Sequence, residues 1–384
     1  MVIPRQIWLW QSILSPHMSS FAVALVKLGC EVTYVAEQSM TDDRVRLGWT
    51  VPVLDGVAVH LMTSLEVIER LVTNASPDSI HLCSGVRANG MVFHAQRALA
   101  RRKLRQWVVM ETVDDAGWRG PFKRLEYRRL LRISRQQVQG VLAIGHRMPD
   151  WIAARGVPLD RIFSFAYFLP SADIVMPRRE REPGPFRFVF AGRLVPFKRV
   201  DWLIDALTDL KYLTFELWIV GTGPEESALR VMAGNGLGDR VRWFGQLPMT
   251  DVPAVLSQAD CLVLPSVHDG WGAVVSEALM SGTPVICSDA CGSAGIVRAS
   301  GLGGVFPCVD SKSLAGLLVQ NLRKGTLSMA DRRSLASWAE CLDGEAGAAY
   351  FLQILDHAEG RRARPLPPWS LGIRVSNQGN YDEQ

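Results

Sequence analysis

Short apolar runs alternate along the chain with longer segments of helical periodicity. Each run ends in a polar or glycine-containing turn, and a helical segment follows. In the first half the runs predict strands at 6–14, 30–37, 79–83, 107–110 and 141–144. Buried strands that alternate with helices form parallel sheets that are covered by helices on both faces.

The alternation stops once and then resumes. At 177–185 the sequence PRREREPGP combines charges with three prolines and a glycine, which is typical of a linker. Beyond it, the pattern predicts strands at 186–192, 215–221, 240–245, 261–266 and 284–289, and an edge strand at 303–310. The chain therefore reads as two α/β halves of similar size.

The predicted fold consists of two facing Rossmann-like domains, at 1–176 and 186–344, joined by the linker at 177–185. A helix is predicted at 345–362, and it can pack against the N-terminal domain. The polar, Pro-rich composition of 363–384 predicts a flexible tail. Parallel sheets bind ligands at the carboxyl ends of their strands. We therefore expect the active site in the cleft between the domains.

Composition favours a globular protein without a membrane span. Of 384 residues, 48% are hydrophobic and 21% are charged, and no apolar run approaches the roughly 18 residues that a spanning helix needs. The apolar start resembles a signal peptide only weakly and reads better as a buried first strand. The seven cysteines are odd in number and lack the second Cys or His pair of a zinc site. We expect reduced thiols in a cytoplasmic protein.

The formal charge of +4 is unevenly distributed, because basic residues exceed acidic residues only in the first half. The excess lies in 101–135, where KRLEYRRLLRISR alternates apolar residues with arginine at helical spacing. Such a helix is either a solvated face or a peripheral contact with the inner face of a membrane, and both interpretations remain open. Nucleic acid is not expected, since no recognition-helix pattern accompanies the charge.

Residues suited to a nucleotide-sugar follow strands of the second half. A diphosphate needs Arg, Lys and free backbone N–H groups, and sugar hydroxyls need carboxylates. Arg193 and Lys198 come directly after the strand at 186–192, although such residues are common in surface loops. Asp269 and Glu277 flank a glycine-containing loop that opens a predicted helix at 273–281.

Several motifs appear here in a fixed order: AGRLVPFK, VGTGPE, FGQL and HDGWGAVVSEALMSGTPVI. In this order, over 186 to about 310, the segment resembles the donor domain of the family 4 (group 1) retaining glycosyltransferases, which have the GT-B fold. The family pattern has an Arg and a Lys after the first strand and two acidic residues eight positions apart. The N-terminal half is similar to the family only in outline.

The resemblance implies a role for each matching residue. Arg193 and Lys198 would bind the donor diphosphate and Glu277 the ribose, while Asp269 stands where the family usually has Glu and would contact the transferred sugar. Because Asp is one methylene shorter, its reach differs. The remaining donor contacts are implied for backbone or loop positions: Gly192, Gly245, Gln246, Leu247, Gly270, Trp271, Gly272 and Ala273.

The implied reaction is retaining transfer of a sugar from a UDP- or GDP-sugar. The catalytic residues would be Arg193, Lys198 and Asp269, and the departing phosphate oxygen would take the proton of the acceptor hydroxyl. The family usually needs no metal, so no metal or cofactor is expected. We expect a saccharide or lipid-linked saccharide acceptor, in the synthesis of surface or exported polysaccharide.

Acceptor-side candidates follow strands of the first half. His17 comes just after the strand at 6–14, in place of the family's glycine-rich loop, and Glu111, Asp114 and Asp115 follow the strand at 107–110. Carboxyl ends of parallel strands meet at one edge of the sheet, so these side chains are expected in the cleft. His146 follows another strand and is interpreted as structural.

Three other functions compete with sugar transfer as interpretations of the sequence, and nicotinamide-dependent chemistry is the first. The turn that starts at Gly221 is not a dinucleotide fingerprint, because Glu226 occupies its sixth position, where Gly or Ala is needed. A nucleotide-sugar epimerase of the same fold and a catalytically inactive nucleotide-sugar-binding relative both stay open. Dependence of donor turnover on an added acceptor distinguishes transfer from both.

Overall fold

The N-terminal sheet contains strands with the order β3-β2-β1-β4-β5-β6-β7, and neighbouring strands are parallel. The computed structural model describes residues 4–87, 89–171 and 184–370. The strands of this first sheet are β1 (Gln6–Ile13), β2 (Glu31–Gln38), β3 (Ala58–Leu61), β4 (Ile80–Ser84), β5 (Arg105–Met110), β6 (Val138–Ile144) and β7 (Ile162–Phe165).

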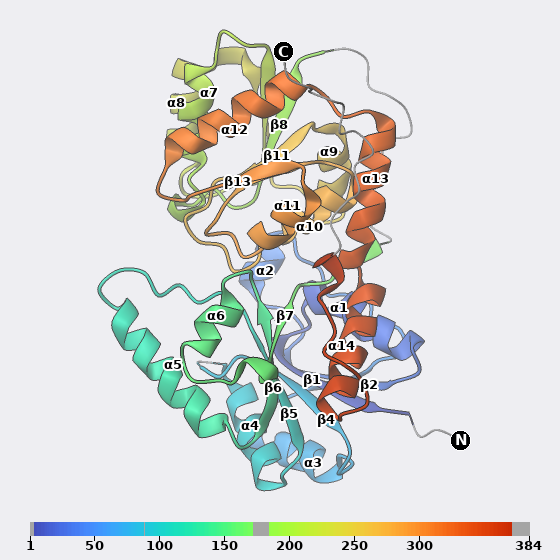
Figure 1. The fold of residues 1–384 in the computed structure, drawn as a ribbon. Helices are drawn as coiled ribbons and strands as arrows, with labels where there is room; N and C mark the ends of the chain where they lie inside the picture. Colours follow the sequence, from blue (N-terminus) through green and yellow to red (C-terminus); the bar gives the residue numbers. More distant parts are fainter. Residues whose placement is uncertain (1–3, 88, 172–183, 371–384) are drawn as a thin grey trace.

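The C-terminal sheet is also parallel and has the order β10-β9-β8-β11-β12-β13. Figure 1 shows the two sheets in separate lobes, one above the other. This arrangement confirms the predicted pair of Rossmann-like domains. The strands of the second sheet are β8 (Phe186–Ala191), β9 (Phe215–Val220), β10 (Val241–Gly245), β11 (Cys261–Leu264), β12 (Val285–Ser288) and β13 (Gly303–Phe306).

Helices connect the strands and cover both faces of each sheet (Figure 1). In the N-terminal lobe they are α1 (Pro16–Lys27), α2 (Asp42–Arg46), α3 (Leu65–Asn74), α4 (Met91–Arg101), α5 (Gly120–Ser134) and α6 (Met148–Ala153). After the linker they are α7 (Val200–Asp209), α8 (Glu226–Gly236), α9 (Val252–Gln258), α10 (Ala273–Met280), α11 (Ala294–Ser300), α12 (Ser311–Lys324), α13 (Met329–Ala339) and α14 (Gly344–Ala358).

The strands form where apolar residues run without interruption, because a central parallel strand is covered on both faces. In β8, with the sequence FRFVFA, every residue except Arg187 is buried, and all of β11 and β12 is buried. Helix starts are set by local caps. The side chains of Ser64, Asp310 and Ser328 each accept a backbone N–H at the start of the helix that follows them.

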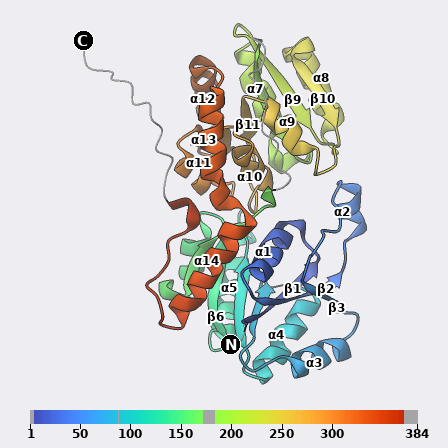
Figure 2. The same ribbon diagram turned by 90° about the vertical axis from the view of Figure 1, so that its right-hand side faces the viewer.

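The last long helix, α14, packs against α1 of the N-terminal lobe (Figure 2). The ring of Phe351 lies 5.7 Å from Phe21 and 6.1 Å from Trp107, and the Tyr350 hydroxyl donates to the carbonyl of Ser164 at 3.1 Å. Gly347 lies against the ring of Phe168 with no room for a Cβ. The N-terminal lobe is therefore built from both ends of the chain.

Residues 363–370 are a correction to the predicted flexible tail. Arg364 donates to the carbonyls of Leu159 and Asp160, and Trp369, in a short 3-10 helix (Pro368–Ser370), lies against Phe168 and Trp271. Polar composition suggested a loose segment, but two anchoring side chains hold it in place. Residues 371–384 of that tail and 177–183 of the predicted linker lie outside the described residues.

No helix in the described part of the chain has the length and apolar character needed to cross a membrane. All seven cysteines lie within the described residues, and each is a free thiol.

A buried histidine couples the stability of the N-terminal lobe to pH. The Nδ1 atom of His81 accepts a hydrogen bond from Trp10 at 3.1 Å, so the proton of the neutral ring sits on Nε2, 2.8 Å from the Ser79 hydroxyl. Burial, and secondarily the charge of Arg102, lowers the pKa of His81 to about 3. Protonation would set two donors, Nδ1–H and the Trp10 N–H, against each other.

We predict that the free energy of unfolding falls as the pH drops from about 6.5 toward 3. In this range the histidine is protonated in the unfolded chain, whereas His81 in the folded protein stays neutral. One such group contributes a slope of at most about 1.4 kcal/mol per pH unit. Urea unfolding at a series of pH values should show a shallower slope for His81→Gln. The exposed His60→Gln is the matched control, and equal slopes for wild type and H81Q would contradict the assignment.

Candidate active site

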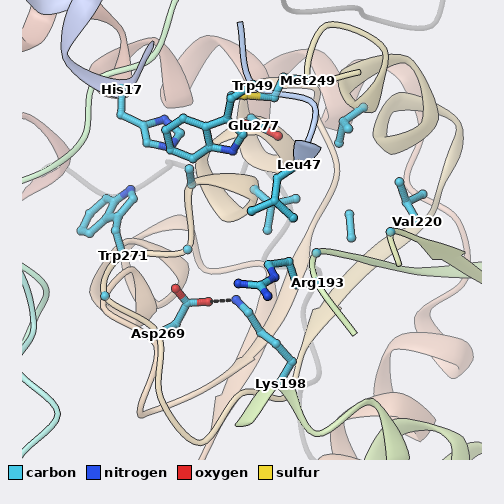
Figure 3. Close-up of a pocket in the computed structure, with 18 of the residues that line it drawn as sticks. His17, Leu47, Trp49, Arg193, Lys198, Val220, Met249, Asp269, Trp271 and Glu277 are labelled. Carbon is cyan, nitrogen blue, oxygen red and sulfur yellow. Dashed lines mark hydrogen bonds and ion pairs between the residues drawn. The ribbon is translucent and has the colours of Figure 1, made fainter. Parts of the chain in front are cut away.

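A cavity of about 390 Å³ lies between the two lobes and is lined by both (Figure 3). From the C-terminal lobe it receives most of the residues that the sequence pointed to: Gly192, Arg193, Lys198, Gln246, Leu247, Asp269, Gly270, Trp271, Gly272, Ala273 and Glu277. The N-terminal lobe supplies His17, Arg44, Leu47, Trp49, Glu111 and Tyr167.

The topology explains why distant motifs meet here. The strand order changes direction between β8 and β11, which are hydrogen-bonded neighbours although β9 and β10 separate them in the chain. Ligands bind at such a switch point in doubly wound sheets. The loop after β8 carries Arg193 and Lys198, and the loop after β11 carries Asp269, so the two motifs face each other at the carboxyl edge of the sheet.

Close backbone packing holds the strand ends together. A Cβ on Gly221, which has φ +123°, would lie 2.0 Å from the carbonyl oxygen of Gly192. Only glycine allows this approach of the loops after β9 and β8. This close approach of Gly221 to Gly192 places both loops at the floor of the cavity.

Lys198 and Asp269 form an ion pair inside the cavity, with 2.5 Å between Nζ and Oδ2 (Figure 3). Their side chains are 16% and 13% exposed, so the pair is largely shielded from bulk water. Arg193 points into the same space and has no ion-pair partner among the described residues (Figure 3). A cationic side chain that faces an open cavity is available to an anionic ligand.

The loop before α10 lines the cavity and leads directly into the N-terminus of the helix. Gly272 precedes the helix with φ +80°, and a Cβ there would lie 2.9 Å from the sulfur of Cys291. Free N–H groups at a helix N-terminus attract anions. The Trp271 side chain is 4% exposed and donates to the Ser276 hydroxyl at 3.2 Å, so it anchors this loop while its neighbours line the cavity.

Glu277 lies in α10 further along the cavity, toward the side where Leu47 and Met249 close it (Figure 3). Gln246 and Leu247 line this end. Gly245, predicted with them, ends β10 beside the cavity and accepts a hydrogen bond from the backbone of Gly221 at 2.7 Å.

The N-terminal wall contains an aromatic cluster around His17. Its ring lies 4.8 Å from Trp49 and 5.3 Å from Tyr167, and the Arg44 guanidinium lies 4.2 Å from the centre of the Trp49 ring. Burial, followed by the charge of Arg44, lowers the pKa of His17 to about 4. The imidazole is therefore neutral near pH 7.

Arg44 and Trp49 were missed in the sequence. They follow β2, and the rule that selected other strand ends would have selected this loop as well. The loop also contacts the opposite lobe, since the backbone N–H of Met249 lies 3.5 Å from the carbonyl oxygen of Gly48 and the Gln246 amide donates to the carbonyl of Arg46.

Glu111 stands where the main cavity meets a second pocket of about 290 Å³. A Cβ on Gly270 would lie 2.9 Å from its Oε2, so the carboxylate directly faces the donor-side loop. Glu111 is exposed to the open cleft, yet the protein atoms crowded around it raise its pKa; Arg44 opposes this rise, and the carboxylate of Asp269 adds to it. Asp114 lines the second pocket with Arg87, Lys123 and Tyr127.

Two other residues from the sequence have structural surroundings. Asp115 accepts from Trp151 at 3.0 Å and pairs with Arg124 and Arg155; although partial burial opposes ionisation, these partners lower the pKa of Asp115. It ties the start of α5 to α6 and lines neither pocket. His146 donates its backbone N–H to the carbonyl of Gly292 at 2.9 Å and joins the lobes, in keeping with a structural role.

Solved structures share the whole architecture. The lipopolysaccharide outer core galactosyltransferase WaaB superposes with a TM-score of 0.69 at 17% identity, over 92% of this chain and 99% of that one. HepE of Anabaena, solved with UDP and glucose, gives 0.66 at 15% identity over 92% and 100%. The protein has the GT-B fold. In this GT-B protein, the cavity described above is the cleft between the two lobes.

The sequence comparisons concentrate on the C-terminal lobe of this GT-B protein. Residues 173–334 match the family model of the glycosyl transferases group 1. Relatives include a phosphatidyl-myo-inositol mannosyltransferase of Mycobacterium leprae, 35% identical over 158 residues, and a D-inositol 3-phosphate glycosyltransferase of Salinispora arenicola, 32% identical over 185 residues. The matches cover 40% and 42% of this chain and 41% of each relative, so the chain spans about two fifths of their length.

Proposed function

We propose that the protein is a retaining glycosyltransferase of family 4, which moves a sugar from a UDP- or GDP-sugar to a hydroxyl of a saccharide or lipid-linked saccharide. One observation carries the proposal. Arg193, Lys198 and the N-terminus of α10 converge on one interdomain cavity, and all three belong to the segment that matches the group 1 glycosyl transferases.

The donor diphosphate would lie between the cations and the N–H groups of the loop before α10. Arg193 is available to it, and Lys198 would turn from Asp269 to the phosphate that becomes the leaving group. Asp269 would then accept hydrogen bonds from the transferred sugar. Charge on the leaving diphosphate grows as the glycosidic bond breaks, so fixed cations there lower the barrier more than they tighten ground-state binding.

The nucleoside would extend along α10 away from the diphosphate. Glu277 would accept the ribose hydroxyls, and the base would lie against Gln246 and Leu247, with Leu47 and Trp49 of the N-terminal lobe above it. Hydrogen bonds from hydroxyls to a carboxylate are stronger than those to a neutral acceptor, which suits a residue that orients the ribose.

The acceptor would enter from the side of the second pocket and present its hydroxyl near Glu111. The bond from the anomeric carbon to the phosphate oxygen breaks, and the acceptor oxygen bonds to the same face of the sugar. The hydroxyl proton passes to the departing phosphate oxygen, so the reaction needs no enzymic base. Glu111 would orient the acceptor by accepting a hydrogen bond from a neighbouring hydroxyl, not from the one that reacts.

The substrate class is inferred from the names of relatives and neighbours. HepE was solved with UDP, and another relative is the amylovoran biosynthesis glycosyltransferase AmsK of Erwinia amylovora, 26% identical over 189 residues. These names support a role in the synthesis of surface or exported polysaccharide.

The test is donor turnover with and without acceptor. Thermal shifts with UDP-, GDP- and ADP-sugars would first identify the base, and release of that nucleoside diphosphate should then depend on an added panel of saccharides and lipid-linked saccharides. Since Arg193 and Lys198 would meet the diphosphate charge, we expect turnover to persist with EDTA, and the product anomer to match the donor by NMR. An altered sugar on an intact diphosphate would instead indicate an epimerase, and binding without turnover an inactive relative.

A further inference from the structure

The helix α5 keeps large apolar side chains on its outer face. Its inner face buries Leu131 and packs Tyr127 and Leu130 against the core of the N-terminal lobe. On the other side, at spacings that repeat every three or four residues, lie apolar side chains in contact with solvent: Phe122, Leu125 and Ile133, which are 69%, 67% and 62% exposed, and just before the helix Trp118, which is 75% exposed.

Arginines are interleaved with these apolar residues. Arg129 and Arg132 fall on the same outer face, with Arg128 at its edge, and none of the three has an ion-pair partner within residues 4–87, 89–171 and 184–370. The acidic Glu126 of the helix is already paired with Arg87 at 2.7 Å. The α5 face, defined as Trp118, Phe122, Leu125, Arg129, Arg132 and Ile133, is therefore both apolar and cationic.

The other basic cluster of this lobe is occupied by internal contacts. Arg101 pairs with Glu69, Arg102 donates to main-chain carbonyls that include Ala75, and Arg105 pairs with Glu359 at 2.8 Å. Within the basic stretch at 101–135, α5 has three exposed arginines, Arg128, Arg129 and Arg132, without an ion-pair partner in the described part of the chain.

We propose that the α5 face docks on the surface of an anionic lipid membrane. Interfacial helices place aromatic and aliphatic side chains at the boundary between headgroups and acyl chains, while arginines contact lipid phosphates. Figure 1 shows α5 at the rim of the N-terminal lobe, with no other element on its outer side. A symmetric contact with a second copy is disfavoured, because it would gather the unpaired arginines of both α5 faces in one interface.

Docking through this face would bring the acceptor side of the cleft to the membrane. The inner side of α5 contributes Lys123 and Tyr127 to the pocket that contains Glu111. A lipid-linked acceptor held in the membrane would then reach that pocket along the helix. This consequence rests on the proposed function, whereas the docking itself does not.

The experiment is co-sedimentation of the full chain with vesicles of phosphatidylcholine alone or enriched in phosphatidylglycerol. We expect binding to the anionic vesicles only, and its loss at high salt. The double variant Arg129→Gln with Arg132→Gln should lower the partition coefficient about 30-fold, since each arginine at such a surface contributes about 1 kcal/mol. Phe122→Ser with Leu125→Ser should weaken binding at each salt concentration at which the wild type binds.

The matched control is Arg323→Gln with Lys324→Gln, which removes the same charge from an exposed end of α12. The proposal is overturned if wild type does not bind anionic vesicles, if control and α5 variants lose binding equally, or if the α5 substitutions instead dissociate a dimer in lipid-free solution. Inorganic phosphate at equal ionic strength should compete no better than chloride. Thermal shifts with nucleotide-sugars should be unchanged in the α5 variants, so failure here is separate from failure of the proposed function.

Discussion

Lys198→Ala should lower kcat/KM for sugar transfer by on the order of 100- to 1,000-fold while the protein remains folded. The Nζ atom lies 2.5 Å from Asp269 in a cavity where the side chain is only 16% exposed. Its charge would stabilise the leaving diphosphate more than the intact donor, so the loss should appear mainly in kcat. Steady-state rates of nucleoside diphosphate release at saturating acceptor would measure it.

Two further variants make the Lys198 result interpretable. Lys211→Ala removes an exposed lysine of the same lobe and should retain wild-type activity and melting temperature. Lys198→Arg keeps the charge in a wider, planar group and should be partly active. Wild-type turnover by Lys198→Ala would show that the diphosphate does not bind beside this residue.

Glu277→Gln should weaken binding of the nucleoside diphosphate about 10- to 100-fold, with a smaller effect on kcat. A hydrogen bond to a charged acceptor contributes about 1.5–3 kcal/mol, and the neutral amide retains only part of it. The expected change is therefore in the KM for the donor. Calorimetric titration of the nucleoside diphosphate would report it directly.

A ribose analogue tests the role of Glu277 more sharply. If its carboxylate holds the ribose, wild type should bind the 2′- or 3′-deoxy nucleotide less tightly than the parent, and Glu277→Gln should lose most of that discrimination. Glu345→Gln, at an exposed carboxylate on α14, serves as the control for the charge change. Undiminished discrimination in Glu277→Gln would assign the ribose to another residue.

The sequence predicted the architecture well where burial dictates residue type. Central strands such as β8 and β11 are apolar throughout, because both of their faces are covered. The edge strand β3 was missed although three of its four residues, AVHL, are apolar; all four are exposed, and the strand is defined by its pairing with β2 rather than by burial. The strand β7 was also not predicted, because its run IFSF is only four residues long. Its place in the sheet is set by pairing with β6.

For the candidate site, motif order located most of the cavity lining that comes from the C-terminal lobe and little of the lining that comes from the N-terminal lobe. The loop from Asp269 to Ala273 keeps its chemistry in a few contiguous residues, so a pattern can find it. The contact of Trp49 with His17 depends on a loop that follows a different strand, and the packing of Trp369 on Trp271 joins residues almost a hundred positions apart. Such contacts are set by tertiary packing, which leaves no local periodicity.

The packing of α14 and Trp369 onto the N-terminal lobe makes the C-terminal lobe an insertion within the N-terminal lobe. A fragment that ends in the linker would leave Phe21 and Trp107 without the ring of Phe351, and an apolar face of α1 would meet water. During synthesis on the ribosome, the core of the N-terminal lobe therefore cannot be completed until α14 has been translated. For the same reason, a chimera that exchanges N-terminal lobes between relatives requires two junctions, one before Phe186 and one near Asp343.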